Sequence, residues 1–456
     1  MRLFGTDGIR GVANRSPMTP FQVVKVGIAL TNFLRKTKSH RPKIIIGKDT
    51  RLSGYMLETS LSAGITAMGG EVLLLGPMPT PGIAFITKNI NADAGVVISA
   101  SHNPYEDNGI KIFSSKGEKL SEEAEKKIER TAISGNIHHL LPPAERIEKN
   151  VRVEDALGRY IVFLKSSLPR DFSLEGYKIV LDCANGATYK IAPMIFDELR
   201  ANVKTIGISP NGKNINKNCG SLYPENAAAM TVKEKADVGF AFDGDGDRCI
   251  AVDETGSVVT GDEIIAIIAE FLKENNRLKN NFVVGTVMTN FGLLKFFEKK
   301  GIRSSIVPVG DRFVLEEMQR RGAVLGGEDS GHIIFLDHHT TGDGIMTALQ
   351  LLTVMRKKRK KLSVLRKTMK RYPQVLLNLK VARRVDFRKI PELREAAARA
   401  DKLLQGRGRT LIRFSGTQPL LRIMVEGPTH KEINNIAIDL KKIFQKKLFG
   451  GRCFTI

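Results

Sequence analysis

Three carboxylates alternate with glycines in the segment Asp243-Gly-Asp-Gly-Asp247-Arg248. Glycine adopts backbone conformations that are closed to other residues, so this loop can turn Asp243, Asp245 and Asp247 towards one point. Close carboxylates repel one another unless a cation neutralises them, and oxygen ligands are typical of Mg²⁺ sites. A solvated acidic turn is the alternative. Because the chain is basic and a strand-like run precedes the loop, the segment favours a metal site.

A second polar loop, Ser99-Ala-Ser101-His102-Asn103-Pro104, offers a nucleophile. A serine hydroxyl reacts poorly unless it is activated, and a nearby metal can activate it. Once phosphorylated, Ser101 would carry a charge of about −1.5 to −2, which suits a neighbouring metal. His102 could bond to the phosphate ester or only shape the loop. Taken alone, a cluster of these residue types is commonly just a turn.

A third loop, Gly327-Glu-Asp-Ser-Gly-His332, has side chains suited to a sugar. Glu328 and Ser330 can exchange hydrogen bonds with sugar hydroxyls. His332 titrates near neutral pH and could act as an acid or a base. An ordinary polar turn is an equally good explanation of this loop by itself.

A fourth segment, Arg413-Phe-Ser-Gly-Thr417, followed by Arg422, is suited to a phosphate. Arginine side chains, hydroxyls and glycine-flanked backbone N–H groups are the donors that a dianionic phosphate needs. A hairpin turn with unrelated arginines is the alternative. Together the four loops supply a nucleophile, a divalent metal, a hydroxyl-binding site and a remote phosphate-binding site, which are the parts of phosphoryl transfer.

The first three loops occupy equivalent places in a weak internal repeat. Three times the chain gives a β-branched run, a helical stretch, a second short strand and a third strand that ends in a polar loop. The third strands are predicted at 95–98, 238–242 and 323–325. Such alternation predicts mainly parallel α/β units, in which ligands lie beyond the carboxyl ends of strands. We therefore expect the three loops to converge on one cleft.

The chain changes character after a basic run. A strand at 375–381, a helix at 392–404, a strand–loop–strand at 410–426 and a helix at 431–446 predict a small α+β unit, with Tyr372-Pro373 as a hinge. The predicted fold class is therefore α/β, with three similar α/β/α domains of mixed sheet and a C-terminal α+β domain.

Composition limits the class of protein. A chain of 456 residues predicts about three or four domains. The N-terminal segment lacks the apolar core of a secretory signal, and the longest apolar stretch is too short to span a bilayer. The four cysteines lie far apart without a CxxC pair, which favours a reducing cytoplasm over a zinc site or a disulfide scaffold.

The net charge of +23 raises the question of nucleic-acid binding. The charge is spread along the chain, and its densest run, Arg356–Lys361, has no interleaved aromatic residues for stacking on bases. A solvated helix end explains this run better. We therefore expect no nucleic-acid or membrane partner, whereas a basic surface suits an anionic sugar phosphate.

The sequence resembles the α-D-phosphohexomutase family over its whole length. The resemblance rests on the four loops and on further motifs: FGTDGIRG (4–11), DCANGA (182–187), PNGKNIN (210–216), GTVMTN (285–290), VGDR (309–312) and TGDG (341–344). FGTDGIRG and PNGKNIN point to the glucosamine branch of the family. The resemblance implies four domains around a central cleft: a phosphoserine-loop domain (1–152), a metal-binding domain (153–254), a sugar-binding domain (255–368) and a phosphate-binding domain (369–456).

The resemblance also implies roles for individual residues. Ser101 is the phosphoserine, and together with Asp243, Asp245 and Asp247 it binds Mg²⁺. The remaining positions that match family motifs are Lys111 and His332 as acid/base groups, Arg10, His102 and Arg248 near the phosphoserine, Glu328 and Ser330 on the sugar, and Arg413, Ser415, Gly416, Thr417 and Arg422 on the non-reacting phosphate. The implied activity is transfer of phosphate between two oxygens of a glucosamine phosphate, in supply of amino-sugar precursors of the cell wall; a homodimer stays open.

Two loops depart from the family's usual pattern. Phe414 and Gln418 stand where the phosphate loop commonly has proline and glutamate, and we expect phosphate binding to survive with altered loop stiffness. Asp329 stands where the glucosamine branch usually has glutamine or asparagine, and it could attract an ammonium group if it faces the substrate. Three other functions stay open: a glucose or mannose phosphate mutase, a sugar-phosphate phosphatase, and a nucleic-acid-binding protein on a degenerate mutase fold.

Overall fold

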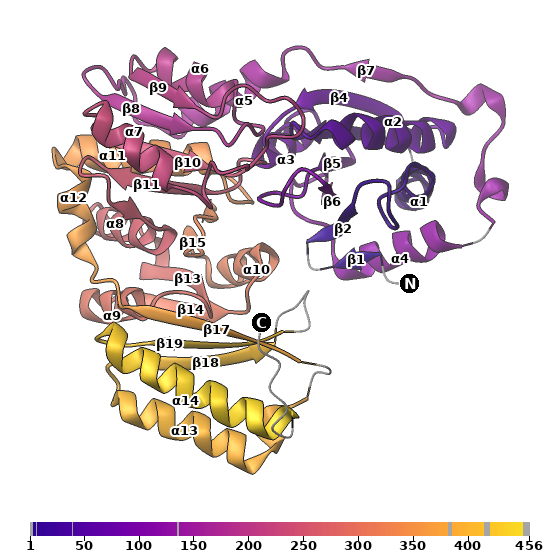
Figure 1. Ribbon diagram of the computed structural model, residues 1–456. Coiled ribbons are helices and arrows are strands. Elements are labelled where there is room, and N and C mark those ends of the chain that lie inside the picture. The colour runs from indigo at the N-terminus through magenta and orange to yellow at the C-terminus, as the bar shows by residue number, and fades with distance from the viewer. Residues whose placement is uncertain are drawn as a thin grey trace. The chain divides into compact units, whose positions relative to one another are not determined.

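The computed structural model describes residues 3–5, 7–38, 40–134, 136–381, 385–414 and 420–449. The chain forms two compact units (Figure 1), one made of Met1–Thr286 and Ser305–Lys367 and the other of Val287–Ser304 and Thr368–Ile456. Among the described residues, no helix is both long enough and apolar enough to cross a membrane.

The first sheet of the larger unit has the strand order β1-β2-β6-β5-β3-β4-β7. Its strands are β1 (Phe4–Gly5), β2 (Gly8–Val12), β3 (Lys43–Lys48), β4 (Glu71–Pro77), β5 (Ala94–Ile98), β6 (Asp107–Ser114) and β7 (Asn150–Arg152). β3, β4, β5 and β7 run parallel, while β6 pairs antiparallel with β5 and β2. The central strands contain buried β-branched runs such as Ile44–Ile46, as expected for strands covered on both faces.

Helices cover this sheet (Figure 1). α1 (Pro20–Thr37) packs against α2 (Leu52–Ala67) and α4 (Glu122–Ile133), whereas α3 (Thr80–Asn89) packs against α5 (Ala156–Ser166). Thr19 is the N-cap of α1: its side chain accepts a hydrogen bond from the Gln22 N–H and so satisfies a free donor of the first turn.

Two further sheets repeat the same design. The second has the order β12-β11-β10-β8-β9 and the third the order β14-β13-β15-β16. Their strands are β8 (Lys178–Asp182), β9 (Asn202–Ile206), β10 (Val238–Phe242), β11 (Cys249–Asp253), β12 (Val258–Val259), β13 (Phe282–Thr286), β14 (Arg303–Val307), β15 (Leu325–Gly327) and β16 (Ile333–Phe335). The associated helices are α6 (Ile191–Glu198), α7 (Glu225–Lys233), α8 (Gly261–Glu274), α10 (Asp311–Arg321), α11 (Gly344–Lys358) and α12 (Leu362–Leu365).

In each of these three sheets, one strand ends in a polar loop, and the chain then forms an antiparallel strand beside it. The loops join β5 to β6, β10 to β11, and β15 to β16. The predicted α/β class with mixed sheets is thereby confirmed. The third of these strands is displaced from its prediction, since β15 begins at Leu325 and ends at Gly327 instead of covering 323–325.

The smaller unit has a three-stranded antiparallel sheet in the order β17-β19-β18. Its elements are β17 (Gln374–Lys380), β18 (Arg409–Phe414), β19 (Leu420–Glu426), α9 (Phe291–Lys300), α13 (Pro391–Leu404) and α14 (His430–Phe449). Leu421, Ile423 and Phe444 are buried in its core. The predicted C-terminal α+β architecture is confirmed. The segment Val287–Ser304 groups with this unit, and the four domain boundaries inferred from the sequence stay predictions.

Candidate active site

Ser101 lies in the loop after β5 and is held in an unusual backbone conformation. Its φ of 54° is in the left-handed region, which non-glycine residues seldom occupy without support from their surroundings. The side chain is buried, and its Oγ donates a hydrogen bond of 2.7 Å to Asp243 Oδ2. Oγ also lies 3.2 Å from His102 Nδ1. The predicted nucleophile therefore contacts the predicted metal loop directly.

Arg51, which the sequence analysis did not single out, holds this loop in place. Its side chain is fully buried, and its guanidinium donates to the backbone oxygens of Ser101, Asn103, Pro104 and Asp107. Arg51 Nε also donates to Asp49 Oδ2 at 2.7 Å. Asp49 and Arg51 both follow β3, at the same edge of the sheet as Ser101. Their position after a parallel strand is the feature of the sequence that could have identified them as part of the site.

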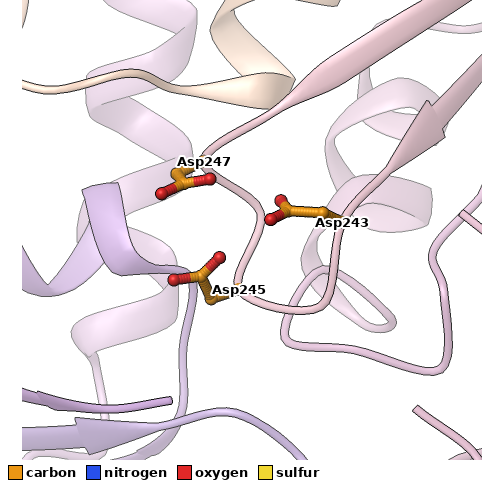
Figure 2. Close-up of side chains that lie close together, drawn as sticks. All are labelled: Asp243, Asp245 and Asp247. Carbon is orange, nitrogen blue, oxygen red and sulfur yellow. The ribbon is translucent and has the colours of Figure 1, made fainter. Parts of the chain in front are cut away.

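Asp243, Asp245 and Asp247 form a cluster in the loop between β10 and β11. Figure 2 shows the three side chains gathered around one point, and one oxygen from each lies within 4.8 Å of the others. All three are buried, and Oδ1 of Asp245 and of Asp247 has no hydrogen-bond partner in the part of the chain that the structure describes. Unpaired buried carboxylate oxygens are costly, so the cluster fits a divalent cation bound by oxygen ligands.

The charges in this cluster are unequal. Burial, followed by the charges of Asp247 and Asp245, raises the pKa of Asp243 well above its ordinary value. Burial also opposes ionisation of Asp245, but the Lys111 ammonium and the hydrogen bonds from Lys111 and Thr80 together outweigh it and lower the pKa of Asp245. A cation among the three carboxylates would favour the ionised form of each.

Lys111 on β6 is a buried partner of the metal loop. Its Nζ donates to Asp245 Oδ2 at 2.7 Å and lies 3.6 Å from Asp247 Oδ2. Burial tends to lower the pKa of Lys111, yet Asp245 and Asp247 raise it above its ordinary value. Lys111 is therefore charged in this arrangement and can neutralise an anion, whereas its raised pKa disfavours release of its proton.

Two arginines and a histidine lie around the phosphoserine loop. The backbone N–H of Arg248 donates to Asp243 Oδ1 at 3.1 Å, and its Nε lies 3.8 Å from Asp247 Oδ1. Burial, then the positive charges of Arg248 and Arg10, lowers the pKa of His102 to about 3. His102 is therefore neutral at physiological pH and suited to hydrogen bonding, whereas Arg10 and Arg248 supply positive charge.

The sugar loop between β15 and β16 is anchored to the metal loop. The backbone N–H of Cys249, just after Arg248, donates to the carbonyl of Gly331 at 3.1 Å. Glu328 Oε1 accepts from the Gly310 N–H at 3.2 Å, and Ser330 Oγ lies 3.4 Å from Glu328 Oε2.

The three loops of the repeat therefore meet. Ser101 bonds to Asp243, and the second loop bonds to the third. Two residues outside the four polar loops, Asn216 and Thr80, strengthen the junction of the first two loops. Asn216 Nδ2 donates to the Ser101 carbonyl at 2.9 Å, and the backbone N–H and Oγ1 of Thr80 both donate to Asp245.

The phosphate loop lies in the smaller unit. Arg413 on β18 pairs in register with Arg422 on β19. Arg422 Nε is buried and has no hydrogen-bond partner among the described residues. Phe414 packs against the core of this unit. The predicted phosphate-binding residues Ser415, Gly416 and Thr417, together with Gln418, fall outside the described residues.

Comparisons with known proteins agree with this architecture. Four sequence models of the phosphoglucomutase/phosphomannomutase family match: α/β/α domain I at residues 1–136, domain II at 159–256, domain III at 260–372 and the C-terminal domain at 376–443. The chain is 54% identical over 447 residues to a phosphoglucosamine mutase of Syntrophus aciditrophicus, covering 98% of this chain and 99% of that protein. It is 49% identical over 451 residues to a phosphoglucosamine mutase of Bdellovibrio bacteriovorus, covering 98% and 99%.

Solved structures show the same fold at low sequence identity. A phosphoglucomutase/phosphomannomutase family protein from Burkholderia thailandensis superposes with a TM-score of 0.82 at 22% identity, covering 99% of this chain and 98% of that one. An N-acetylphosphoglucosamine mutase from Aspergillus fumigatus, in complex with GlcNAc-6P and magnesium, gives 0.72 at 17%, covering 98% and 96%. The sequence relatives, spanning nearly the whole chain at about half identity, place this protein in the phosphoglucomutase/phosphomannomutase family of phosphohexomutases.

Proposed function

We propose that this chain interconverts glucosamine 6-phosphate and glucosamine 1-phosphate, and that phosphorylated Ser101 is the phosphate donor and acceptor. The observation that carries the proposal is the bond of 2.7 Å between Ser101 Oγ and Asp243 Oδ2, because it brings the nucleophile to the carboxylate cluster. The names of relatives that match nearly the whole chain support glucosamine phosphate as the substrate.

The reaction has two transfers of opposite direction. The bond between phosphorus and Ser101 Oγ breaks while phosphorus bonds to O1 of glucosamine 6-phosphate, and the O1 proton passes to a base. The resulting 1,6-bisphosphate then reorients within the site, so that its O6 phosphoryl group faces Ser101. Its O6 phosphoryl group then returns to Ser101 Oγ, O6 regains a proton, and glucosamine 1-phosphate leaves. The phosphate count is unchanged, so no inorganic phosphate is released.

We propose Mg²⁺ as the cation held by Asp243, Asp245 and Asp247, with an oxygen of phosphorylated Ser101 as a further ligand. Oδ1 of Asp245 and of Asp247 accepts no hydrogen bond from the described residues, which supports this assignment. The ion, when bound, neutralises negative charge on the transferring group. Lys111, Arg10 and Arg248 add positive charge from the protein, which the phosphorylated loop needs because it gains a charge of about −1.5 to −2 beside three carboxylates.

His332 is the proposed acid/base group for the sugar hydroxyls, with Glu328 and Ser330 as the residues that hold them. Lys111 is proposed as the second acid/base group, as the family resemblance implies, and its Nζ lies 2.7 Å from Asp245 Oδ2. In the smaller unit, Arg413 and Arg422, with Ser415, Gly416 and Thr417, are the proposed ligands of the non-reacting phosphate. Arginine and backbone donors suit this role because they bind a phosphate dianion in either orientation of the sugar.

A cytoplasmic location is part of the proposal. Cys183, Cys219 and Cys249 are free thiols and all are buried, as suits a protein that stays in a reducing compartment.

A kinetic comparison tests the substrate. Glucosamine 6-phosphate should be isomerised with a higher kcat/KM than glucose 6-phosphate or mannose 6-phosphate, and Ser101→Ala should abolish all three activities. A higher kcat/KM with glucose or mannose phosphate would assign the chain to the other branch of the family. Substantial mutase activity in Ser101→Ala would refute the phosphoserine mechanism.

A further inference from the structure

The imidazole of His332 is buried without a hydrogen-bond partner. The residue is only 4% exposed, and neither Nδ1 nor Nε2 is bonded to any described group. Leaving a buried donor and acceptor unpaired is costly, so a side chain in this state has a partner in the working protein. One ring nitrogen can bond to the protein and the other to the substrate, and the surroundings of the ring indicate which is which.

The His332 ring has protein against its face and an acidic side chain near Nε2. A Cβ atom at Gly342 would lie 2.5 Å from Nε2, 2.6 Å from Cδ2 and 2.7 Å from Cε1 of His332, and such similar distances place it over the face of the ring, so only glycine fits against this face. Asp311 Oδ2 lies 4.0 Å from Nε2. The position of Asp311 assigns Nε2 to the protein side of the imidazole.

The two oxygens of Asp311 have different surroundings. Oδ1 accepts hydrogen bonds from Lys119 Nζ at 2.7 Å and from the Arg312 N–H at 2.8 Å. Oδ2 is left to face His332. Burial opposes ionisation of Asp311, but Lys119 and then His332 outweigh it and lower the pKa of Asp311. Asp311 is therefore a fixed negative charge, and a movement of about 1 Å would bring Nε2 into hydrogen-bond distance of it.

An acid at the start of α10 also has a purely structural explanation. Asp311 is the first residue of this helix, where the helix dipole favours a negative charge. That effect accounts for an acidic residue and for the bond to the Arg312 N–H. It does not account for the bond from the half-buried Lys119 to Oδ1, or for the orientation of Oδ2 towards His332.

The same short segment contacts a second side chain of the sugar loop. The Gly310 N–H donates to Glu328 Oε1 at 3.2 Å, and Gly310 has a φ of 137°, which other residues rarely adopt. Gly310 and Asp311 thus reach Glu328 and His332 together. Gly310 and Asp311 lie outside the sugar loop in the sequence, yet they contact Glu328 and His332, the loop residues proposed to bind the sugar and to transfer its protons.

We infer that Asp311 is a positioning residue for His332: its Oδ2 accepts a hydrogen bond from Nε2–H, which leaves Nδ1 as the nitrogen that exchanges a proton with the substrate hydroxyl. The inference rests on the proposed function, in which His332 is the acid/base group. A partner on one ring nitrogen fixes the tautomer and the orientation of the ring, so the other nitrogen is held ready for proton transfer.

Asp311→Asn tests the inference because it removes the charge and keeps the shape. We expect kcat to fall about 10–100-fold, the usual cost of removing a residue that orients a functional group, with little change in KM. Asp311→Glu, which restores a carboxylate, should recover part of kcat. Asp155→Asn is the matched control, because Asp155 also stands at the start of a helix, α5, and its carboxylate accepts a hydrogen bond from Arg159 Nε at 2.8 Å. This control should keep wild-type kcat.

Nitrogen NMR of histidine-labelled protein gives a readout that a merely structural role would not move. The wild type should show His332, assigned with His332→Gln, as the Nε2–H tautomer, and Asp311→Asn should show a mixture. An Nδ1–H tautomer in the wild type, or an unchanged kcat in Asp311→Asn, would overturn the inference. A rise in KM with kcat unchanged would also overturn it, since Asp311 would then act on substrate binding.

Failure of the proposed function gives a different result. If wild-type protein does not turn over glucosamine 6-phosphate and Ser101 carries no phosphate by intact mass, the proposed reaction is wrong whatever the tautomer of His332. If the wild type turns over and Asp311→Asn does so equally well, only the role of Asp311 is wrong.

Discussion

Replacement of Arg51 by lysine tests whether Arg51 holds the phosphoserine loop in its conformation, because the substitution changes no residue of that loop. The Arg51 guanidinium makes five hydrogen bonds, one to Asp49 and four to backbone oxygens of the loop. Lysine keeps the charge but has three donors on one nitrogen, so at least two of the five hydrogen bonds are lost. At about 1.5–3 kcal/mol for a hydrogen bond to a charged group, the loss is about 3–6 kcal/mol.

This loss should appear both in stability and in the reactivity of Ser101. Arg51→Lys should unfold at a lower temperature than the wild type. Because Ser101 depends on its neighbours to keep a φ of 54°, the loop should also relax and move the hydroxyl. A displacement of about 1 Å costs about 100-fold in rate, so we expect a loss of that size in transfer to Ser101.

The assay mixes dephosphorylated protein with glucosamine 1,6-bisphosphate and follows phosphate gain on Ser101 by intact mass. Arg366→Lys is the control, because Arg366 bonds to Glu263 and Asp253 and touches no atom of the loop. It should lose stability while keeping the transfer rate. A transfer rate for Arg51→Lys within about twofold of the wild type would refute the account of how the loop is held.

Three other outcomes follow from the site. Removal of divalent metal with a chelator should abolish turnover and Mg²⁺ should restore it, whereas activity that survives chelation would show that Asp243, Asp245 and Asp247 act without a cation. Folded His102 has its pKa lowered from 6.5 to about 3, so only the unfolded chain binds this proton in between. The stability that His102 contributes is therefore present above pH 6.5 and is lost as the pH falls towards 3; a thermal unfolding series should show a steeper acid loss in the wild type than in His102→Gln, and parallel curves would contradict the assignment. Gly342→Ala should lower kcat more than it raises KM, because its Cβ would overlap the His332 ring, and a variant with wild-type kcat would show that the ring has room to move.

The sequence was sufficient to predict the three polar loops because each of them follows a strand end, and that they carry the chemistry stays a prediction. The loops containing Ser101, Asp243 and Glu328 follow strands at equivalent places in the repeat, and parallel strands deliver such loops to one edge. The structure adds that each of these strands is followed, after its loop, by an antiparallel neighbour. That pairing tightens the loop between them and fixes the side chains at its tip.

The supporting residues could not be predicted in the same way. Arg51 bonds to carbonyls 50–56 positions away, and backbone acceptors leave no mark on residue type. Lys111 meets Asp245 across 134 positions, so its pairing with the metal loop depends on how two sheets come together. Asp311 looks like an ordinary first-turn acid of α10, and its second oxygen acquires meaning only when His332 is placed beside it.

A single turnover with radiolabelled phosphate on Ser101 tests the central claim most directly. Phosphorylated protein, mixed with unlabelled glucosamine 6-phosphate and quenched rapidly, should pass its label to the 1,6-bisphosphate and then to glucosamine 1-phosphate, with none released as inorganic phosphate. Label that appears as inorganic phosphate would identify a phosphatase. Label that stays on the protein while glucosamine 1-phosphate accumulates would contradict the role of Ser101.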